Sequence, residues 1–350
     1  MRLEEIRRKI DDIDRELLCL HVERHDLSLR TRHHKALVED RSREETVLLR
    51  AQHTQLGLVE PDFAGQVFKS IIEHSKQLQE RVAHLVGFQG DHGSYSEVAA
   101  RALIPDGAFI PCARFGEVFD GVAEGELDLA VVPVENSLEG TVTPVNELLT
   151  RTELAVRGEV SVPVRHCLLA PVDADHREIR AAYSHPQALA QCRGFLERNR
   201  LEPRPYYDTA GAARMVARDR PPGAAAIASA LSAELHGMQV LKEGVADDRA
   251  NTTRFLLLGR EPIDDGDKCS IVFSVAHQAG RLHGVLELFA EAGINLSRIA
   301  SMPQRGEPGN YSFFLDFEGS DQDEQVGAVI DRTRELTGTL RFLGCYPSAR

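Results

Sequence analysis

The sequence lacks three features that mark large classes of proteins. It has no apolar run near the roughly 18 residues of a membrane span, and its charged start, Met1-Arg2-Leu3-Glu4-Glu5, is unlike a signal peptide. Its six cysteines lie far apart, without CxxC or zinc-type spacing. It has no excess of positive charge, with 41 Lys+Arg against 54 Asp+Glu. We therefore expect a reduced, cytoplasmic protein that binds neither membrane nor nucleic acid.

Three stretches of different periodicity indicate a multidomain protein, as the length of 350 residues does. Residues 1–84 follow helical spacing, and one narrow apolar stripe runs along Leu3–Leu20. Further helices are expected near 43–55 and from Pro61 onward. Because three such helices enclose little core by themselves, we expect this all-helical domain to form a homodimer.

The rest of the chain predicts two further domains. In residues 85–262, short apolar runs bounded by Gly and Pro alternate with helical stretches, which is typical of an α/β domain with a parallel or mixed sheet. A polar stretch, 261–267, reads as a linker. Residues 268–350 then predict the order strand, helix, strand, strand, helix, strand, which is the βαββαβ ferredoxin-like pattern.

Several polar residues of the helical domain share helix faces, and they indicate a function only when they are considered together. Asp40, Arg43 and Glu44 lie three and four apart, as Ser75 and Gln79 do on a later helix. Taken singly, such residues are ordinary solvated ion pairs. Together they resemble the all-helical chorismate mutases, through I-R-R-K-I-D-x-I-D-x-E-L-L from residue 6, E-R at 23–24, D-x-x-R-E at 40–44 and I-I-E-x-S-x-x-x-Q from residue 71.

The resemblance implies a dimer of interlocked helices that isomerises chorismate to prephenate without a cofactor. A Claisen rearrangement needs only a chair-like geometry and stabilisation of charge on the breaking ether oxygen. Arg7, supplied by the partner chain, and Arg24 would clamp the carboxylates. Lys35 and Gln79 would donate to the ether oxygen, and Glu44 would accept from the ring hydroxyl. The full implied substrate set is Arg7, Arg24, Lys35, Asp40, Arg43, Glu44, Ser75 and Gln79.

Four polar segments follow or enter apolar runs in the α/β domain: G-F-Q-G-D-H-G-S-Y-S (87–96), P-V-E-N-S-L-E-G (133–140), S-H-P-Q-A (184–188) and N-T-T-R-F (251–255). The glycines of the first do not fit GxGxxG, so a nucleotide fingerprint fails. The helix that follows them makes a carboxylate site plausible. Singly, each segment reads as a turn or a helix cap.

Together with D-T-A-G-A-A (208–213), these segments resemble the prephenate dehydratases along residues 86–260. The resemblance implies two α/β subdomains around a cleft, similar to solute-binding proteins, with Thr253 catalytic. We interpret Thr253 as a donor to the leaving hydroxyl, with Glu135 or His185 as the proton source. Arg254 suits the pyruvyl carboxylate. The other expected binding groups are Asn136, Ser137, Ser184, Gln187 and Thr209.

Residues 268–346 resemble an ACT domain, through A-G-I-N-L-S-R-I from residue 292 and L-G-C-Y-P from residue 343. Such domains bind L-phenylalanine, and the implied contacts are Gly280, Leu282 and Asn295. The positions that match the family's E-S-R-P motif read Ala-Ser-Met-Pro at 300–303. We therefore expect phenylalanine inhibition to be weaker than is usual for the family, or absent.

The order of the three domains resembles the bifunctional chorismate mutase–prephenate dehydratases of phenylalanine biosynthesis. The expected function is conversion of chorismate to prephenate and then to phenylpyruvate. Two alternatives stay open. A non-catalytic amino-acid sensor needs neither Thr253 nor the mutase residues, and a chain with a decayed dehydratase would accumulate prephenate from chorismate.

Overall fold

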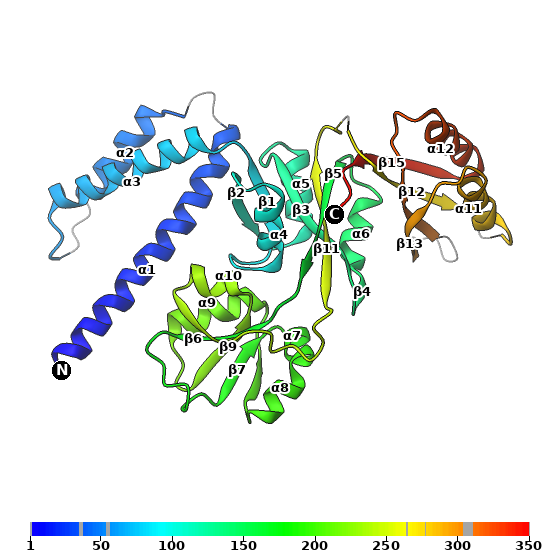
Figure 1. Ribbon diagram of the computed structural model, residues 1–350. Helices are drawn as coiled ribbons and strands as arrows, with labels where there is room; N and C mark the ends of the chain where they lie inside the picture. Colours follow the sequence, from blue (N-terminus) through cyan, green and yellow to red (C-terminus); the bar gives the residue numbers. More distant parts are fainter. Residues whose placement is uncertain are drawn as a thin grey trace.

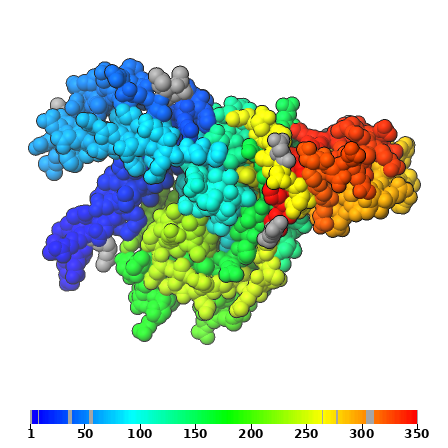
Figure 2. Space-filling view, turned by 45° about the horizontal axis from the view of Figure 1, so that its top comes forward, coloured from blue at the N-terminus to red at the C-terminus, as the bar shows by residue number. Residues whose placement is uncertain are grey.

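The structure is a computed structural model that describes residues 2–34, 38–53, 57–263, 265–276, 278–303 and 311–349. Figure 1 shows a helical part at one end, a two-lobed α/β body in the middle and a small α/β unit at the other end. In the space-filling view of Figure 2 the last unit protrudes from the body. Among the described residues, no helix is both long and apolar enough to cross a membrane.

The helical part consists of α1 (Leu3–Arg30), the short 3-10 helix η1 (Thr31–His34), α2 (Arg41–His53) and α3 (Pro61–Arg81). Pro61 suits the first turn of α3, because a proline there lacks only an N–H that would be unpaired anyway. Helices α2 and α3 lie side by side, whereas the first half of α1 extends away from them (Figure 1). Little of this part is buried, as expected for three helices that enclose little core by themselves.

The first lobe of the body contains a six-stranded sheet in the order β2-β1-β3-β11-β5, with β4 paired to β3. Its strands are β1 (Leu85–Gln89), β2 (Ala108–Cys112), β3 (Leu129–Asn136), β4 (Gly140–Thr141), β5 (Ala155–Pro163) and β11 (Thr252–Gly259). Helix α4 (Tyr95–Leu103) packs on one set of core residues of this sheet, and α5 (Phe115–Ala123) and α6 (Thr143–Leu149) pack on another. Strand β11 returns late in the chain and runs antiparallel to both β3 and β5.

The second lobe is built from the intervening residues around a five-stranded sheet in the order β10-β6-β9-β7-β8. Its strands are β6 (Cys167–Pro171), β7 (Ala181–Ser184), β8 (Glu202–Pro205), β9 (Ala224–Ala228) and β10 (Met238–Lys242). Its helices are α7 (Pro186–Gln191), α8 (Arg193–Arg198), α9 (Thr209–Asp219) and α10 (Ala230–Leu235). The chain therefore passes between the lobes twice, after β5 and before β11.

The C-terminal unit consists of β12 (Lys268–Val275), α11 (Arg281–Glu291), β13 (Leu296–Pro303), β14 (Tyr311–Glu318), α12 (Glu324–Leu336) and β15 (Thr339–Tyr346). Its antiparallel sheet has the order β13-β14-β12-β15. Both helices pack with one face of the sheet. Residues of the opposite face, among them Phe314 and Tyr346, share a core with the first lobe. The multidomain fold class expected from the sequence, with its βαββαβ end, is confirmed.

Candidate active sites

A cavity of about 240 Å³ lies between the three helices of the helical part. Six residues of the predicted substrate set line it, although they are spread over more than fifty positions of the sequence: Arg24, Asp40, Arg43, Glu44, Ser75 and Gln79. Apolar side chains such as Leu27 and Ile72 complete the wall. The cavity therefore combines cationic and hydrogen-bonding groups with an apolar surface, which suits a small anionic ring compound.

Hydrogen bonds hold several of these side chains in place. Arg24 donates from Nη1 to the Ser75 hydroxyl at 2.8 Å. Gln79 donates from Nε2 to the carbonyl and the hydroxyl of Ser28. The Asp40 carboxylate accepts from the backbone N–H of Arg43 at 3.1 Å, so it also helps to begin α2. Burial lowers the pKa of Arg24 from its ordinary value. These contacts restrict the rotamers of the cavity wall before a ligand binds.

Lys76 is a cavity residue that the sequence reasoning missed. Its ammonium group donates to Glu44 Oε2 at 3.0 Å, and both residues line the cavity. Its position directly after Ser75 could have indicated it. Because successive positions of a helix point in different directions, the sequence did not place Lys76 beside Ser75. Glu44 therefore has a cationic partner inside the cavity.

Two predicted residues are not part of this cavity wall. Lys35 lies outside the described residues. Arg7 lies on α1 and is exposed. At 1.5 Å per residue, the 17 positions that separate Arg7 from Arg24 correspond to about 25 Å along the helix. Arg7 therefore cannot reach the cavity of its own chain.

The second cluster of predicted residues lies around Thr253 on β11. Asn136, at the end of β3, donates from Nδ2 to Thr253 Oγ1 at 2.9 Å and to Asn251 Oδ1 at 2.7 Å. The amide oxygen of Asn136, Oδ1, accepts from the backbone N–H groups of Leu138 and Glu139. Thr253 thus accepts one hydrogen bond, and within the described ranges no group accepts its hydroxyl proton. That proton is available to a substrate.

A chain of polar side chains continues from Asn251 into the second lobe. Asn251 donates to Gln191 Oε1 at 3.2 Å, and the same oxygen lies 3.0 Å from His166 Nε2. Because an amide oxygen only accepts, Nε2 carries the proton and the other ring nitrogen of His166 accepts from Tyr95 at 3.2 Å. Burial lowers the pKa of His166, so the ring is neutral. This series of hydrogen bonds joins the two lobes near Thr253.

His166, Gln191 and Asn251 were not on the predicted list. Gln191 closes the S-H-P-Q-A-L-x-Q-C segment, and Asn251 opens N-x-T-R-F, so both motifs contained the signal. His166 follows β5 and belongs to none of the motifs, so only the tertiary structure places it near Gln191.

Two expectations for this site are corrected. The Arg254 guanidinium does not point toward Thr253's partners, because successive side chains of a strand face opposite ways. It is buried at the contact with the C-terminal unit, where it pairs with Glu159 and Asp316. Glu135 also points there and pairs with Arg298 at 3.0 Å. Neither is placed for the role of carboxylate ligand or proton source.

The remaining predicted residues have different surroundings. Ser137 donates to the Ala250 carbonyl and accepts from the Thr252 N–H, so it ties the ends of β3 and β11 together. Ser184 is fully buried and donates to the Ile227 carbonyl, which is a structural bond between strands and corrects its expected binding role. His185 caps α7 by accepting from the Gln187 N–H. Thr209 begins α9.

The G-D-H-G-S-Y turn lies between the two lobes, at the start of α4. The Glu97 carboxylate, fully buried, accepts from the Gly93 N–H at 2.7 Å, so the start of α4 already has a carboxylate of its own. Gly93 has a φ of +91°, and a Cβ there would lie 2.7 Å from the Ser232 backbone of the second lobe. A ligand carboxylate at this helix start would lie beside Glu97, and the expected carboxylate site stays a prediction.

The predicted amino-acid contacts of the C-terminal unit lie near its helix face. Gly280, with a φ of +84°, precedes α11, and Leu282 packs at the edge of the core beneath that helix. Asn295 donates to Glu318 at 2.9 Å. Met302 instead is buried in the core shared with the first lobe, and Ala300 packs against the same core.

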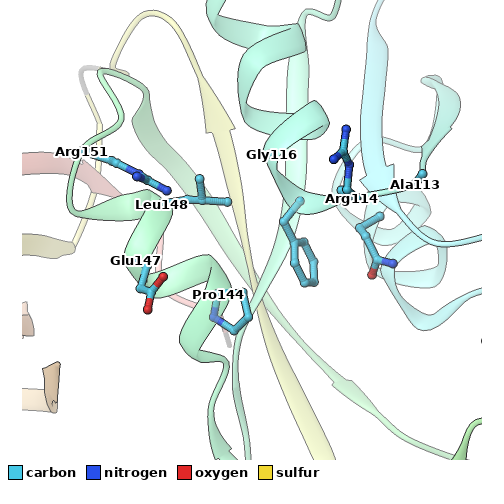
Figure 3. Close-up of a pocket in the computed structure, with 9 residues that line it drawn as sticks. Ala113, Arg114, Gly116, Pro144, Glu147, Leu148 and Arg151 are labelled. Atoms are coloured by element: carbon cyan, nitrogen blue, oxygen red, sulfur yellow. The ribbon is translucent and has the colours of Figure 1, made fainter. Parts of the chain in front are cut away.

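A further cavity, of about 390 Å³, contains none of the predicted residues. It lies on the first lobe between the start of α5 and helix α6. Figure 3 shows Arg114 on one side of it and Pro144, Glu147 and Arg151 on the other. Arg114 pairs with Glu117 at 3.0 Å.

The chain matches three family models in sequence order: chorismate mutase type II over residues 6–80, prephenate dehydratase over 86–263 and the ACT domain over 270–335. Together with the helical cavity and the two-lobed body, these matches define a multidomain enzyme of aromatic amino-acid biosynthesis. The chain belongs to the bifunctional chorismate mutase/prephenate dehydratase family.

Relatives support this assignment over different lengths. The bifunctional chorismate mutase/prephenate dehydratase of Escherichia coli is 33% identical over 98% of this chain and 95% of its own length. An arogenate dehydratase/prephenate dehydratase of Arabidopsis thaliana is 40% identical over 78% of this chain and 76% of its own length. A solved prephenate dehydratase from Arthrobacter aurescens, in complex with L-Phe, is 32% identical and covers 76% of this chain and 90% of its own, with a TM-score of 0.69.

Proposed function

We propose that residues 1–84 rearrange chorismate to prephenate and that residues 85–262 convert prephenate to phenylpyruvate, with residues 268–350 as the regulatory domain. The observation that carries the first step is the cavity, in which the cations Arg24, Arg43 and Lys76 lie beside hydrogen-bonding and apolar side chains. Chorismate carries two carboxylates, so a cavity with several cations lowers its binding free energy.

In the mutase step, charge develops on the breaking ether oxygen. The Gln79 amide nitrogen lies within hydrogen-bond distance of the Ser28 carbonyl and of the Ser28 and Thr31 hydroxyls, and it turns one of its two protons from a hydroxyl to the ether oxygen when the substrate binds. Lys35 is the second donor. Glu44, held by Lys76, accepts from the ring hydroxyl. No group needs to gain or lose a proton during the step.

A homodimer completes the mutase site. The apolar stripe of α1 is unpaired along its first half, where Leu3, Ile6, Ile10, Ile13, Leu17 and Leu20 are between 39% and 62% exposed. A second copy of α1 would cover this stripe and bring Arg7 to the partner's cavity.

Mixing two inactive variants tests this arrangement. Arg7→Ala and Gln79→Ala chains each lack one residue of every site, but a mixed dimer has one intact site if Arg7 crosses between subunits. After unfolding and refolding together, about a quarter of the unmodified mutase activity should return. A mixture as inactive as its components would contradict the shared site.

In the dehydratase step, prephenate loses carbon dioxide and its ring hydroxyl as the ring becomes aromatic. Thr253 donates a hydrogen bond to the departing oxygen, and Asn136 donates to Thr253 Oγ1. The series of hydrogen bonds through Asn251 and Gln191 to His166 connects this hydroxyl with the second lobe. Since Glu135 is paired with Arg298, His185 is the predicted proton source that is left, and its proton converts the departing hydroxyl to water.

Prephenate is the substrate that the first step makes available. One relative's name includes arogenate, in which an amino group replaces the keto group of prephenate. Assays with each compound therefore distinguish the substrates. We expect higher kcat/KM for prephenate, and a preference for arogenate would contradict the proposed sequence of reactions.

A coupled assay with separated variants tests the whole function. The unmodified chain should turn chorismate into phenylpyruvate. Gln79→Ala should block chorismate consumption but leave turnover of supplied prephenate unchanged, and Thr253→Val should accumulate prephenate. Gln77→Ala, exposed on the same helix, and Thr252→Val, next to Thr253, are the matched controls. Equal loss of both activities in either site variant would contradict separate sites.

A further inference from the structure

A buried polar network joins the dehydratase and ACT domains. Its charged members are Glu159 on β5, Arg254 on β11, and Lys268 and Asp316 of the ACT sheet, whose side chains are at most 14% exposed. Arg254 donates from Nε to Glu159 Oε2 at 2.7 Å and from Nη1 to Asp316 Oδ2. Lys268 donates to both Glu159 oxygens. The two carboxylates thus face two cations inside the molecule.

Neutral side chains fix the same network from the ACT side. The Tyr346 hydroxyl accepts from Arg254 Nη2 at 3.2 Å and lies 2.6 Å from the Ser270 hydroxyl. Ser270 in turn donates to Asp316 at 2.6 Å. Every nitrogen of the Arg254 guanidinium is therefore engaged within the protein. Although burial alone would lower the pKa of Arg254, the neighbouring carboxylates raise it above its ordinary value, so the cation stays charged.

The position of Arg254 in the strand gives this network a consequence for the active site. Thr253 is its direct neighbour in sequence, and the pairing of β11 with β3 shifts register between Arg254 and Phe255. A bulge interrupts the ladder hydrogen bonds locally. The strand end that holds Thr253 therefore has an interrupted ladder with β3, although its pairing with β5 is regular there, and the Arg254 side chain makes a further attachment to the ACT domain.

We propose that Arg254 is a positioning residue of the dehydratase reaction, which Glu159 and the ACT-domain residue Asp316 hold in place so that Thr253 keeps its orientation. The inference rests on the proposed function of Thr253. It makes the ACT sheet a structural part of the dehydratase site. It also replaces substrate binding as the role of Arg254, because the guanidinium has no nitrogen left for a substrate carboxylate.

The test uses the full chain and steady-state kinetics with prephenate. Arg254→Lys keeps the charge but loses the forked geometry, and Asp316→Asn keeps the shape but loses the charge. We expect each to lower kcat by about 10- to 100-fold with KM within about twofold, since a misplaced catalytic group loses rate rather than ground-state binding. Mutase activity on chorismate should stay unchanged in both variants, which would show that the helical domain is folded.

Arg260→Gln is the matched control. Arg260 directly follows β11 at its other end and donates to the carbonyls of Val122 and Leu127. Its loss should lower thermal stability without changing kcat or KM for prephenate.

Three results would overturn the inference. A raised KM at unchanged kcat would restore substrate binding as the role of Arg254. Unchanged kinetics in both variants would show that Thr253 needs no anchor. A loss of kcat in Arg260→Gln as large as that in Arg254→Lys and Asp316→Asn would indicate a general structural role. An unmodified chain that does not turn over prephenate would refute the proposed function itself, and the inference with it.

Discussion

His92 is the residue through which pH should act on the contact between the mutase helix and the dehydratase domain. Its Nε2 lies 3.1 Å from the Asp26 carboxylate on α1, and its Nδ1 lies 3.2 Å from the buried Glu97 carboxylate. Burial alone would lower the pKa of His92, but the hydrogen bonds and charges of the two carboxylates raise it to about 9. At neutral pH this histidine is therefore a cation between two anions.

The size of the effect follows from linkage. An unfolded histidine titrates near 6.5, so the folded state binds the proton more tightly, and the difference corresponds to about 3 kcal/mol of stability. Because the folded pKa is the higher one, this stabilisation is complete below about pH 6.5. It falls as the pH rises and is lost once the pH passes through about 9.

Equilibrium urea unfolding of the full chain between pH 6 and 10 measures this dependence. The unmodified chain should lose about 3 kcal/mol across that range, and His92→Gln should lose much less because no proton leaves position 92. His84→Gln replaces an exposed histidine at the other end of β1 and should behave like the unmodified chain. Identical pH slopes for His92→Gln and the unmodified chain would refute the assignment.

Three further predictions concern the sites. Thr253→Ser should keep most dehydratase turnover, while Thr253→Val should lose at least about tenfold; equal rates would show that the hydroxyl has no chemical role. Gln79→Glu should confine mutase activity to acidic pH, since only a protonated carboxyl donates to the ether oxygen; a flat pH–rate profile would argue against that contact. Phenylalanine should inhibit prephenate turnover weakly, because Ala300 and Met302 offer no polar side-chain contact and Met302 is packed in a core. A titration with half-inhibition at low micromolar phenylalanine would contradict this.

Local patterns were enough to predict most of the helices and strands. The Leu3–Leu20 stripe predicted α1, and Pro61 predicted the start of α3, because helix spacing and capping depend on near neighbours in sequence. The βαββαβ order of the C-terminal unit followed from alternating runs in the same way. The family motifs then selected Arg24, Ser75 and Thr253 as candidate site residues.

Which side chains meet depended on tertiary structure. Arg254 and Thr253 are adjacent in the motif, yet the strand directs one toward the ACT domain and leaves the other at the lobe junction. Asn251 reaches Gln191 only because the chain returns from the second lobe just before β11. The sequence by itself determined the helices and strands and the motifs that select candidate residues, since residue type and spacing are local. Only the tertiary structure decided their partners, because burial and hydrogen bonding join residues that are far apart along the chain.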